Sequence, residues 1–125
     1  MVVSLKKMMD EAHRSVPKIS LEKAMNLIET GAAVPLDVRD EAEFRDKEKV
    51  PGAVNLPRAY IEFKADPESA RHDPFLEWTK TYLVYCQTGG RAALASKTLK
   101  DMGFTDVRLL GGISEWIEAG GPTED

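Results

Sequence analysis

The sequence predicts an α/β domain with a central, mainly parallel sheet of about five short strands. Short apolar runs typical of strands alternate with helical patterns of the length that connects parallel strands. The 125 residues suit one domain with a substantial core. No internal repeat or low-complexity linker divides the chain, so we expect one folded unit.

An amphipathic helix is predicted at the N-terminus, where Ser4 can cap it and Pro17 ends it. Its apolar residues recur at three- and four-residue spacing: Leu5, Met8, Met9 and Ala12. We assign residues 1–16 to this helix, packed on the domain, and residues 17–125 to the domain itself. A dimer or partner face is the alternative use of the apolar side.

Two strands and a helix are expected next. Residues 16–19 have the pattern of a short strand, and they precede a helix that Ser20 caps and Gly31 ends. Residues 33–38 form the next predicted strand. Pro35 cannot donate to a ladder, so we expect irregular pairing there.

The middle of the chain is less regular. A short helix is expected from Asp40, with residues 41–49 as a solvated face, and residues 53–56 form another strand. Pro67 resembles a helix start. Three large apolar side chains are expected in the core or over the pocket: Phe75, Leu76 and Trp78.

The last third has the clearest pattern: a buried strand at residues 83–85, a tight turn at 87–90, and a helix from Arg91 that Gly103 ends. The buried side of that helix is predicted to contain Leu94, Ala95, Leu99 and Met102. A strand at residues 107–110 follows, and then a short helix whose inward side chains are Ile113, Trp116 and Ile117.

Cys86, the only cysteine, ends an apolar strand and faces the start of a helix. Consecutive glycines at 89 and 90 allow the backbone N–H groups of residues 88–91 to curl into an anion nest, and the helix dipole adds to it. Arg91, Lys97 and Lys100 add positive charge, with no acid among residues 86–100. A thiolate forms readily in such a place, which favours a reactive cysteine over the alternative of a small core residue.

Cys86-Gln-Thr-Gly-Gly-Arg91 resembles the Cys-x-x-Gly-x-Arg active-site loop of rhodanese-type sulfurtransferases. Further segments are similar to the family's motifs in family order, over about residues 17–122: Leu36–Asp40 with Glu43-Phe44, Val50–Pro57, Met102–Phe104, Leu110–Trp116 and Gly121-Pro122. The resemblance implies a rhodanese-like fold with helices on both faces of the sheet. Lys49 departs from the pattern, where a histidine commonly precedes the Pro-Gly-Ala segment.

The resemblance implies Cys86 as the catalytic nucleophile. Asp37 and Arg39, at the carboxyl end of their strand, are implied to brace the site. Arg58 is a further candidate cation for an anionic substrate, or else a surface arginine. The substrate and persulfide loop would comprise Gln87, Thr88, Gly89, Gly90 and Arg91.

The implied function is transfer of a sulfane sulfur from a donor such as thiosulfate to a thiophilic acceptor through a Cys86 persulfide, as in a thiosulfate:cyanide sulfurtransferase. One alternative is a non-catalytic binding or sulfur-carrier module. Another is a cysteine phosphatase or arsenate reductase, which is less consistent with the loop. Those loops place arginine six residues after cysteine, whereas Arg91 is five after, and Tyr85 replaces the histidine that usually precedes it.

The composition of the chain limits which classes of partner and which cellular location we expect. With net charge −4 and no dense basic block, nucleic acid is not expected, and no apolar run approaches a membrane span. One cysteine excludes an intramolecular disulfide and, with no signal peptide evident, suggests a cytoplasmic protein. We expect no metal or cofactor, a small-molecule sulfur donor, a thiol or cyanide acceptor, a possible protein sulfur acceptor, and a monomer or weak homodimer.

Overall fold

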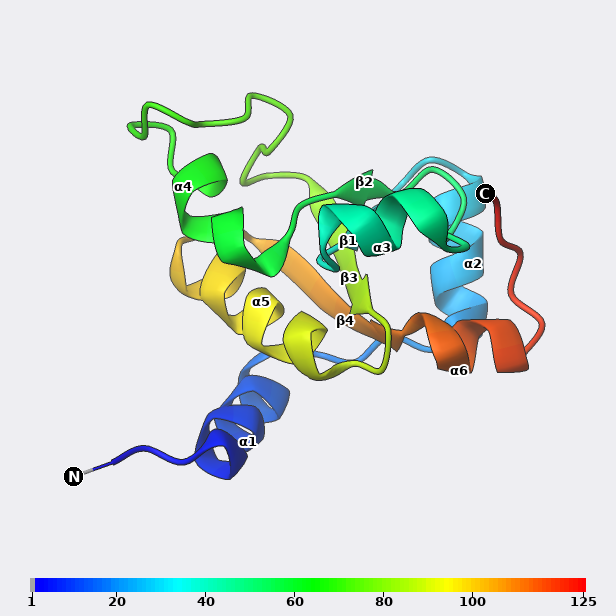
Figure 1. The fold of residues 1–125 in the computed structure, drawn as a ribbon, viewed down its shortest axis with the longest axis horizontal. Coiled ribbons are helices and arrows are strands. Elements are labelled where there is room, and N and C mark those ends of the chain that lie inside the picture. The colour runs from blue at the N-terminus through cyan, green and yellow to red at the C-terminus, as the bar shows by residue number, and fades with distance from the viewer. Residues whose placement is uncertain (1) are drawn as a thin grey trace.

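A computed structural model describes residues 2–125, and in it a four-stranded parallel sheet runs in the order β2-β1-β3-β4 (Figure 1). The strands are β1 (Val34–Asp37), β2 (Val54–Asn55), β3 (Thr81–Cys86) and β4 (Asp106–Gly112). Every pairing is parallel, because helical connections separate the strands. The predicted α/β class with a parallel sheet is confirmed.

Helices cover both faces of the sheet. One apolar cluster joins α1 (Leu5–Ser15), α4 (Ile61–Ala65) and α5 (Gly90–Asp101) to the face that carries Val84 and Cys86. The other joins α2 (Leu21–Glu29) and α6 (Ile113–Glu118) to the face that carries Leu83 and Tyr85. Alternate residues of β3 thus fill two cores. The short α3 (Glu41–Asp46) and the 3-10 turn η1 (Arg58–Tyr60) flank β2 in sequence.

The prediction of a fifth strand at residues 16–19 is wrong, because this segment does not form a strand. Only one parallel bridge forms, between Lys18 and Leu109, with Ile19 donating to the Leu109 carbonyl at 3.1 Å. Val16 still caps α1 and Ser20 already caps α2, so three residues remain between the caps. Pro17 among them has no N–H to donate.

Pro35 lies in β1 without breaking the sheet. The Asp37 carbonyl accepts from Leu56 N on the β2 side, so Pro35, two residues earlier, faces the same side. β2 pairs only with Leu36 and Asp37, whereas β3 pairs with all four residues of β1. The nitrogen of Pro35 therefore faces the β2 side, where this residue has no pairing partner and needs no N–H donor. The irregular pairing expected near Pro35 takes the form of a short β2.

The predicted caps are confirmed. Ser4 accepts from Lys7 N at 3.0 Å, and Ser20 accepts from Lys23 N at 3.2 Å. Gly103, at φ +106°, ends α5. The next residue, Phe104, donates back to the Leu99 carbonyl.

Three side chains expected inside are exposed: Met102 (37%), Ile117 (42%) and Trp78 (61%). Met102 caps the end of α5 and Ile117 lies in the last turn of α6, beyond the face that the sheet covers. The Trp78 carbonyl accepts from Thr105, which fixes the backbone and leaves the ring outside. Leu76 is buried as expected, and Pro67 begins turns rather than a helix.

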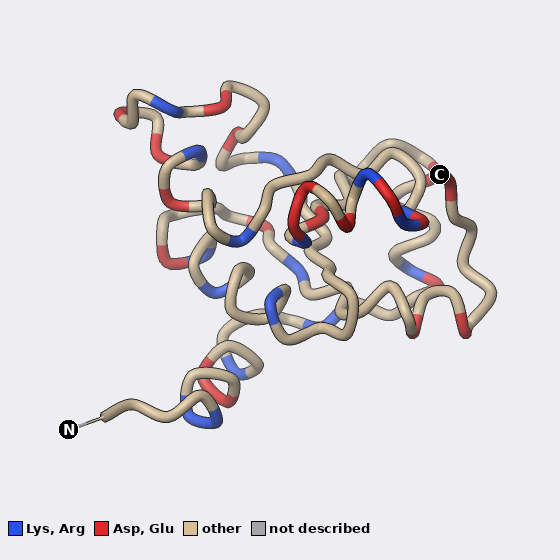
Figure 2. The backbone as a smooth tube through the Cα atoms, viewed as in Figure 1, with Lys and Arg blue, Asp and Glu red and all other residues tan. Residues whose placement is uncertain are grey.

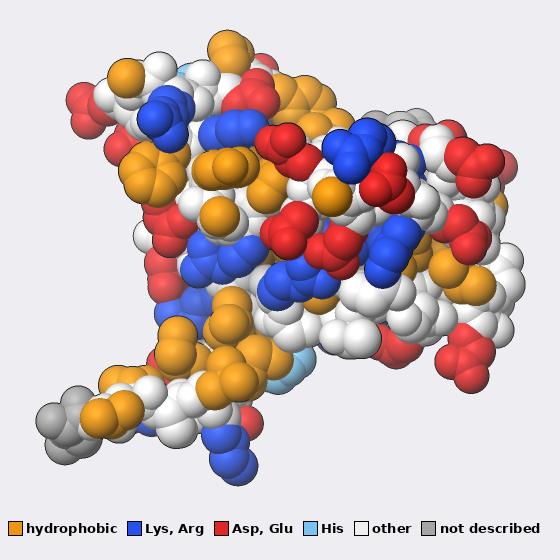
Figure 3. All heavy atoms as spheres, viewed as in Figure 1, with side chains coloured by type: hydrophobic (Ala, Val, Ile, Leu, Met, Phe, Trp, Pro, Cys, Tyr) orange, Lys and Arg blue, Asp and Glu red, His pale blue; other side chains and the backbone are white. Residues whose placement is uncertain are grey.

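The N-terminal helix packs by only part of its apolar side. Ala12 is fully buried and Met9 partly buried against α5, whereas Leu5 (66%) and Met8 (45%) stay exposed on the projecting end of the molecule (Figures 1 and 3). Within residues 2–125, no helix has the length and apolar character needed to cross a membrane.

Candidate active site

Cys86 is the last residue of β3, an interior strand, and α5 begins four residues later at Gly90. The thiol is free and its residue is 1% exposed. The chain leaves β1 toward β2 on one side and leaves β3 toward β4 on the other. Ligands of open α/β sheets bind where neighbouring connections diverge in this way, at the carboxyl ends of the strands.

Two backbone N–H groups point at the sulfur. Gly89 N lies 3.1 Å and Ala92 N lies 3.4 Å from Cys86 Sγ. Both belong to the cap and first turn of α5, whose N–H groups have no partner within the helix. The expected donors were residues 88–91; the structure has Gly89 from this range and Ala92 one residue beyond it. An anionic sulfur is stabilised by both bonds and by the helix dipole.

Gly89 has a φ of +111°, a conformation that side-chain-bearing residues rarely adopt. Gly90 has no such requirement, so one glycine of the pair shapes the turn. The loop also lies against the end of β4: a Cβ at Gly112 would lie 2.8 Å from the Gln87 carbonyl oxygen. The absence of a side chain at Gly112 therefore lets the backbone of the active-site loop pack directly against the end of β4.

Arg91 does not stand as a free charge. Its Nη1 and Nη2 donate to the two carboxylate oxygens of Glu43 at 2.7 and 3.1 Å. This hydrogen bond lowers the pKa of Glu43 to about 2 and raises the pKa of Arg91. Glu43 was expected on a solvated face of α3 and instead ties α3 to the loop.

The predicted positive island around the loop is accordingly wrong. Lys97 pairs with Asp101, and Arg91 with Glu43. Acidic and basic residues lie side by side where α3 meets the start of α5 (Figures 2 and 3). Lys100, at the far end of α5, donates to the Ser15 carbonyl. The N–H groups therefore supply the positive potential at the sulfur, since Arg91, the cation of the loop, is paired.

Asp37 and Arg39 form a fully buried ion pair with Nη2 and Oδ2 2.7 Å apart. Burial is the largest single influence on the pKa of Arg39 and lowers it, but the hydrogen bond to Asp37 and the negative charges nearby, that of Asp37 first, together raise this pKa above its ordinary value. Arg39 Nη1 also donates to Gln87 Oε1 at 3.2 Å, and Nη2 donates to the Glu48 carbonyl at 3.0 Å. The pair thus holds the first residue after Cys86.

Ser114, at the start of α6, holds the same residue from the other side. Its hydroxyl donates to the Gln87 carbonyl at 3.0 Å and accepts from Gln87 Nε2 at 3.2 Å. We did not predict Ser114 as a site residue. Its only sequence signal is its place in the Leu110–Trp116 segment of the family resemblance.

Arg58 lies away from the loop. Its guanidinium donates to Thr98 and to Glu62, each at 3.3 Å. Thr98 is eight residues into α5, or roughly 12 Å along the helix from Gly90. Thr88 is exposed in the turn and makes no side-chain hydrogen bond among the described residues. The structure therefore brings together Cys86, Gln87, Gly89, Arg91, Asp37 and Arg39, but not Arg58.

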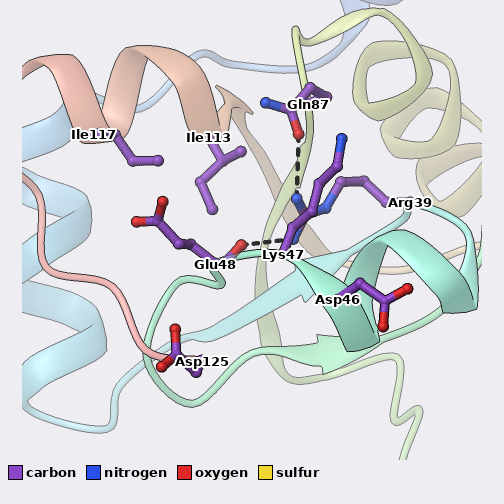
Figure 4. A pocket seen from close by; sticks show the side chains of 8 residues that line it. All are labelled: Arg39, Asp46, Lys47, Glu48, Gln87, Ile113, Ile117 and Asp125. Atoms are coloured by element: carbon purple, nitrogen blue, oxygen red, sulfur yellow. Dashed lines mark hydrogen bonds between the residues drawn. The ribbon is translucent and has the colours of Figure 1, made fainter.

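A pocket of about 330 Å³ opens beside Gln87 and Arg39 (Figure 4). Its remaining walls come from α3, the segment that follows it, α6 and the C-terminal residue Asp125. Within residues 2–125, no group of three or more His, Cys, Asp or Glu side chains converges as metal ligands would.

Comparison with known proteins identifies the relatives of this chain. Residues 20–119 match the rhodanese-like domain. Thiosulfate sulfurtransferase 16, chloroplastic, of Arabidopsis thaliana is 35% identical over 124 residues, covering 93% of this chain and 99% of the relative. The putative sulfur carrier protein YrkF of Bacillus subtilis (strain 168) is 28% identical over 82% of this chain. The matched region is only 51% of the length of YrkF.

A solved structure shares nearly the whole fold. It is a protein of unknown function, described as a possible tyrosine phosphatase, from Rhodopseudomonas palustris CGA009, with a TM-score of 0.90 and 36% identity. The alignment covers 99% of this chain and 96% of that one. The cysteine loop, the parallel sheet and the match to the rhodanese-like domain all agree. The chain therefore belongs to the rhodanese-like sulfurtransferase family.

Proposed function

We propose that the protein transfers a sulfane sulfur through a persulfide on Cys86, with thiosulfate as the donor. The Cys86 thiolate attacks the outer sulfur of thiosulfate, forming an S–S bond, and sulfite leaves with the electron pair of the broken bond. An acceptor then attacks the outer sulfur, and Cys86 leaves as a thiolate. The supporting observation is the pair of N–H groups aimed at Sγ from the start of α5.

Preorganised N–H donors in a site that excludes water stabilise developing negative charge strongly. Cys86 lies in such a place, at 1% exposure with two donors already aimed. Arg91, engaged with Glu43, acts in this scheme by holding the loop. Asp37 and Arg39 act in the same way through Gln87.

The acceptor must come from outside the chain. A single cysteine cannot resolve the persulfide as an internal disulfide, so a thiol, cyanide or a protein nucleophile takes the sulfur. Thiosulfate-dependent thiocyanate production from cyanide tests the scheme. We expect turnover by the native protein and none by Cys86→Ser with the same circular dichroism. Equal thiocyanate production by the serine variant would refute the nucleophile.

Phosphatase activity is a second candidate, because the relative from Rhodopseudomonas palustris is described as a possible tyrosine phosphatase. The loop supports it less. A phosphoryl cradle needs the arginine to turn toward the anion, and both terminal nitrogens of Arg91 donate to Glu43. Hydrolysis of p-nitrophenyl phosphate is expected to be absent at enzyme concentrations that give full sulfur transfer.

A sulfur-carrier role is the other candidate, in view of the carrier name that YrkF bears. A carrier would load Cys86 yet turn over slowly with small acceptors. Comparing the two half-reactions separates the roles: an enzyme discharges its persulfide to small thiols as fast as it loads, whereas a carrier does not.

A further inference from the structure

The N-terminal helix α1 has an apolar edge that its own domain does not cover. Leu5 and Met8 of this helix are 66% and 45% exposed, and Val3, just before it, is 56% exposed. Ala12, farther along the same helix, is fully buried against the domain. The N-terminal end of α1 projects from the rest of the molecule, with apolar side chains gathered on it (Figures 1 and 3). Adjoining apolar side chains left in water in this way mark a contact surface.

A hollow of about 220 Å³ adjoins this edge where α1 lies beside α5. Met8 and Glu11 of α1 and Leu94 of α5 line it. Its other lining residues are Arg58, Lys97, Thr98 and Asp101. The apolar edge therefore continues into a recess that can receive an apolar side chain from another molecule.

The charged residues along α1 form two sets with the same four-residue spacing. Lys6 and Asp10 pair with each other at 2.9 Å and lie on the side of the helix opposite Met8. Lys7 and Glu11 lie together on one flank of Met8, and neither forms an ion pair within residues 2–125. A positive and a negative charge, one turn apart, thus remain unpaired beside the apolar edge.

This pattern is complementary to a second copy of itself. If two α1 helices pack antiparallel about a two-fold axis at Met8, Lys7 of each copy lies about 3 Å along the axis from Glu11 of the other, within reach of a lysine side chain. Both ion pairs form together, because a two-fold interface uses the same patch on each chain. Leu5 of each copy then lies opposite Glu11 of the other, at the hollow beside Leu94. The two helix dipoles also run in opposite directions, which favours the arrangement.

We propose that the protein self-associates as a two-fold dimer through α1, with Leu5 of each copy in the hollow between α1 and α5 of the other. Met8 of the two copies meets at the axis, and the two Lys7–Glu11 pairs flank it. One short helix from each chain makes this contact, which places it at the small end of the range for specific interfaces. The dimer is therefore weak and forms only at high protein concentration.

Sedimentation equilibrium over a range of protein concentrations tests the dimer. We expect the native protein to shift from monomer to dimer as its concentration rises into the millimolar range. Leu5→Ser is expected to weaken dimerisation roughly tenfold or more, because each dimer loses two apolar contacts. Ile117→Ser, at an exposed apolar position of α6, is the matched control and should dimerise like the native protein. Native protein that stays monomeric, or equal effects of the two variants, overturns the proposal.

Charge reversal tests the antiparallel register. Lys7→Glu and Glu11→Lys each place two like-charged pairs in the dimer and are expected to weaken it roughly tenfold. A mixture of the two single variants restores opposite charges in both pairs, as does a chain that carries both changes, so each should dimerise like the native protein. Lys6→Glu, on the opposite side of α1, is the control and should not weaken the dimer. If the mixture and the double variant associate no better than the single variants, the proposed pairing is wrong.

Nuclear magnetic resonance spectra recorded as a function of concentration locate the interface. We expect amide shifts in residues 3–11 and at Leu94, and circular dichroism should show that every variant keeps its helices. Shifts confined to another surface would mean that the copies meet elsewhere and would overturn the proposal. Self-association does not depend on the proposed sulfur transfer, so either can fail without the other.

Discussion

At the scale of single residues, the sulfur depends most on Gly89, because one conformation of this residue aims an N–H group at Sγ from 3.1 Å. The Cβ of an alanine there would lie no closer than 3.6 Å to any other atom, an ordinary van der Waals contact, so the cost is backbone strain at φ +111°. Strain of this kind costs about 1–2 kcal/mol, and the loop can relieve it only by turning the N–H group away.

Gly89→Ala should therefore lower stability by about 1–2 kcal/mol and slow persulfide formation at least tenfold. Gly31→Ala is the matched control, because Gly31 has φ +76°, open space around its Cβ position and no contact with the sulfur. Urea unfolding and rapid-quench mass analysis should find similar destabilisation in both variants and slow loading in Gly89→Ala alone. Normal loading by Gly89→Ala would show that this N–H group is dispensable.

The Glu43–Arg91 pair predicts a pH-dependent contribution to stability. The hydrogen bond from Arg91 lowers the pKa of Glu43 from 4.5 to about 2, so the folded state favours the ionised carboxylate. That stabilisation is fully present above pH 4.5 and is lost as pH falls toward 2. Both side chains are partly exposed, which limits its size to about 1 kcal/mol.

Glu43→Gln should thus be less stable than the native protein by about 1 kcal/mol at pH 7, and the difference should shrink between pH 4.5 and pH 2. Glu41→Gln, at an exposed position of the same helix, should show no such pH dependence. Urea unfolding at several pH values measures both variants. A difference that stays constant across this range would mean that the pair contributes nothing through ionisation.

At the scale of elements, α6 positions the active-site loop through Ser114, whose hydroxyl both donates to and accepts from Gln87. Ser114→Ala should cost about 1 kcal/mol of stability and slow sulfur loading several-fold, because Gln87 loses both hydrogen bonds of the hydroxyl and is held less firmly by Arg39 and the Ser114 N–H group alone. Ser15→Ala, which removes a comparable bond to the Glu11 carbonyl in α1, should leave loading unchanged. Equal loading rates in the two variants would remove the positioning role from Ser114.

Element boundaries followed from local sequence where a residue has a strong backbone preference. Ser4, Ser20 and Gly103 act where they were predicted, because caps and left-handed stops depend on a few neighbouring residues. The strand at residues 16–19 failed because the room left between two caps is a property of the assembled chain. The prediction that Trp78 lies in the core or over the pocket failed for a similar reason, because Thr105, 27 residues away in sequence, holds the Trp78 backbone.

At the scale of the whole molecule, the position of Cys86 was predictable, because strand, turn and helix follow one another in sequence. The residues that brace its loop were not. Glu43 reaches Arg91 across 48 residues, and Ser114 reaches Gln87 across 27. Such contacts arise only when β1, β3 and β4 lie side by side, and the positive charge predicted for the loop was therefore overestimated.

The proposed function depends on one chemical step, the loading of sulfur on Cys86, and intact-protein mass tests this step most directly. The native protein is incubated with thiosulfate under non-reducing conditions, digested and mapped, and then treated with cyanide. We expect a gain of one sulfur atom on the peptide that contains Cys86, lost again as thiocyanate. An unmodified thiol that still reacts with an alkylating reagent, after incubation with excess thiosulfate, would contradict persulfide chemistry with this donor.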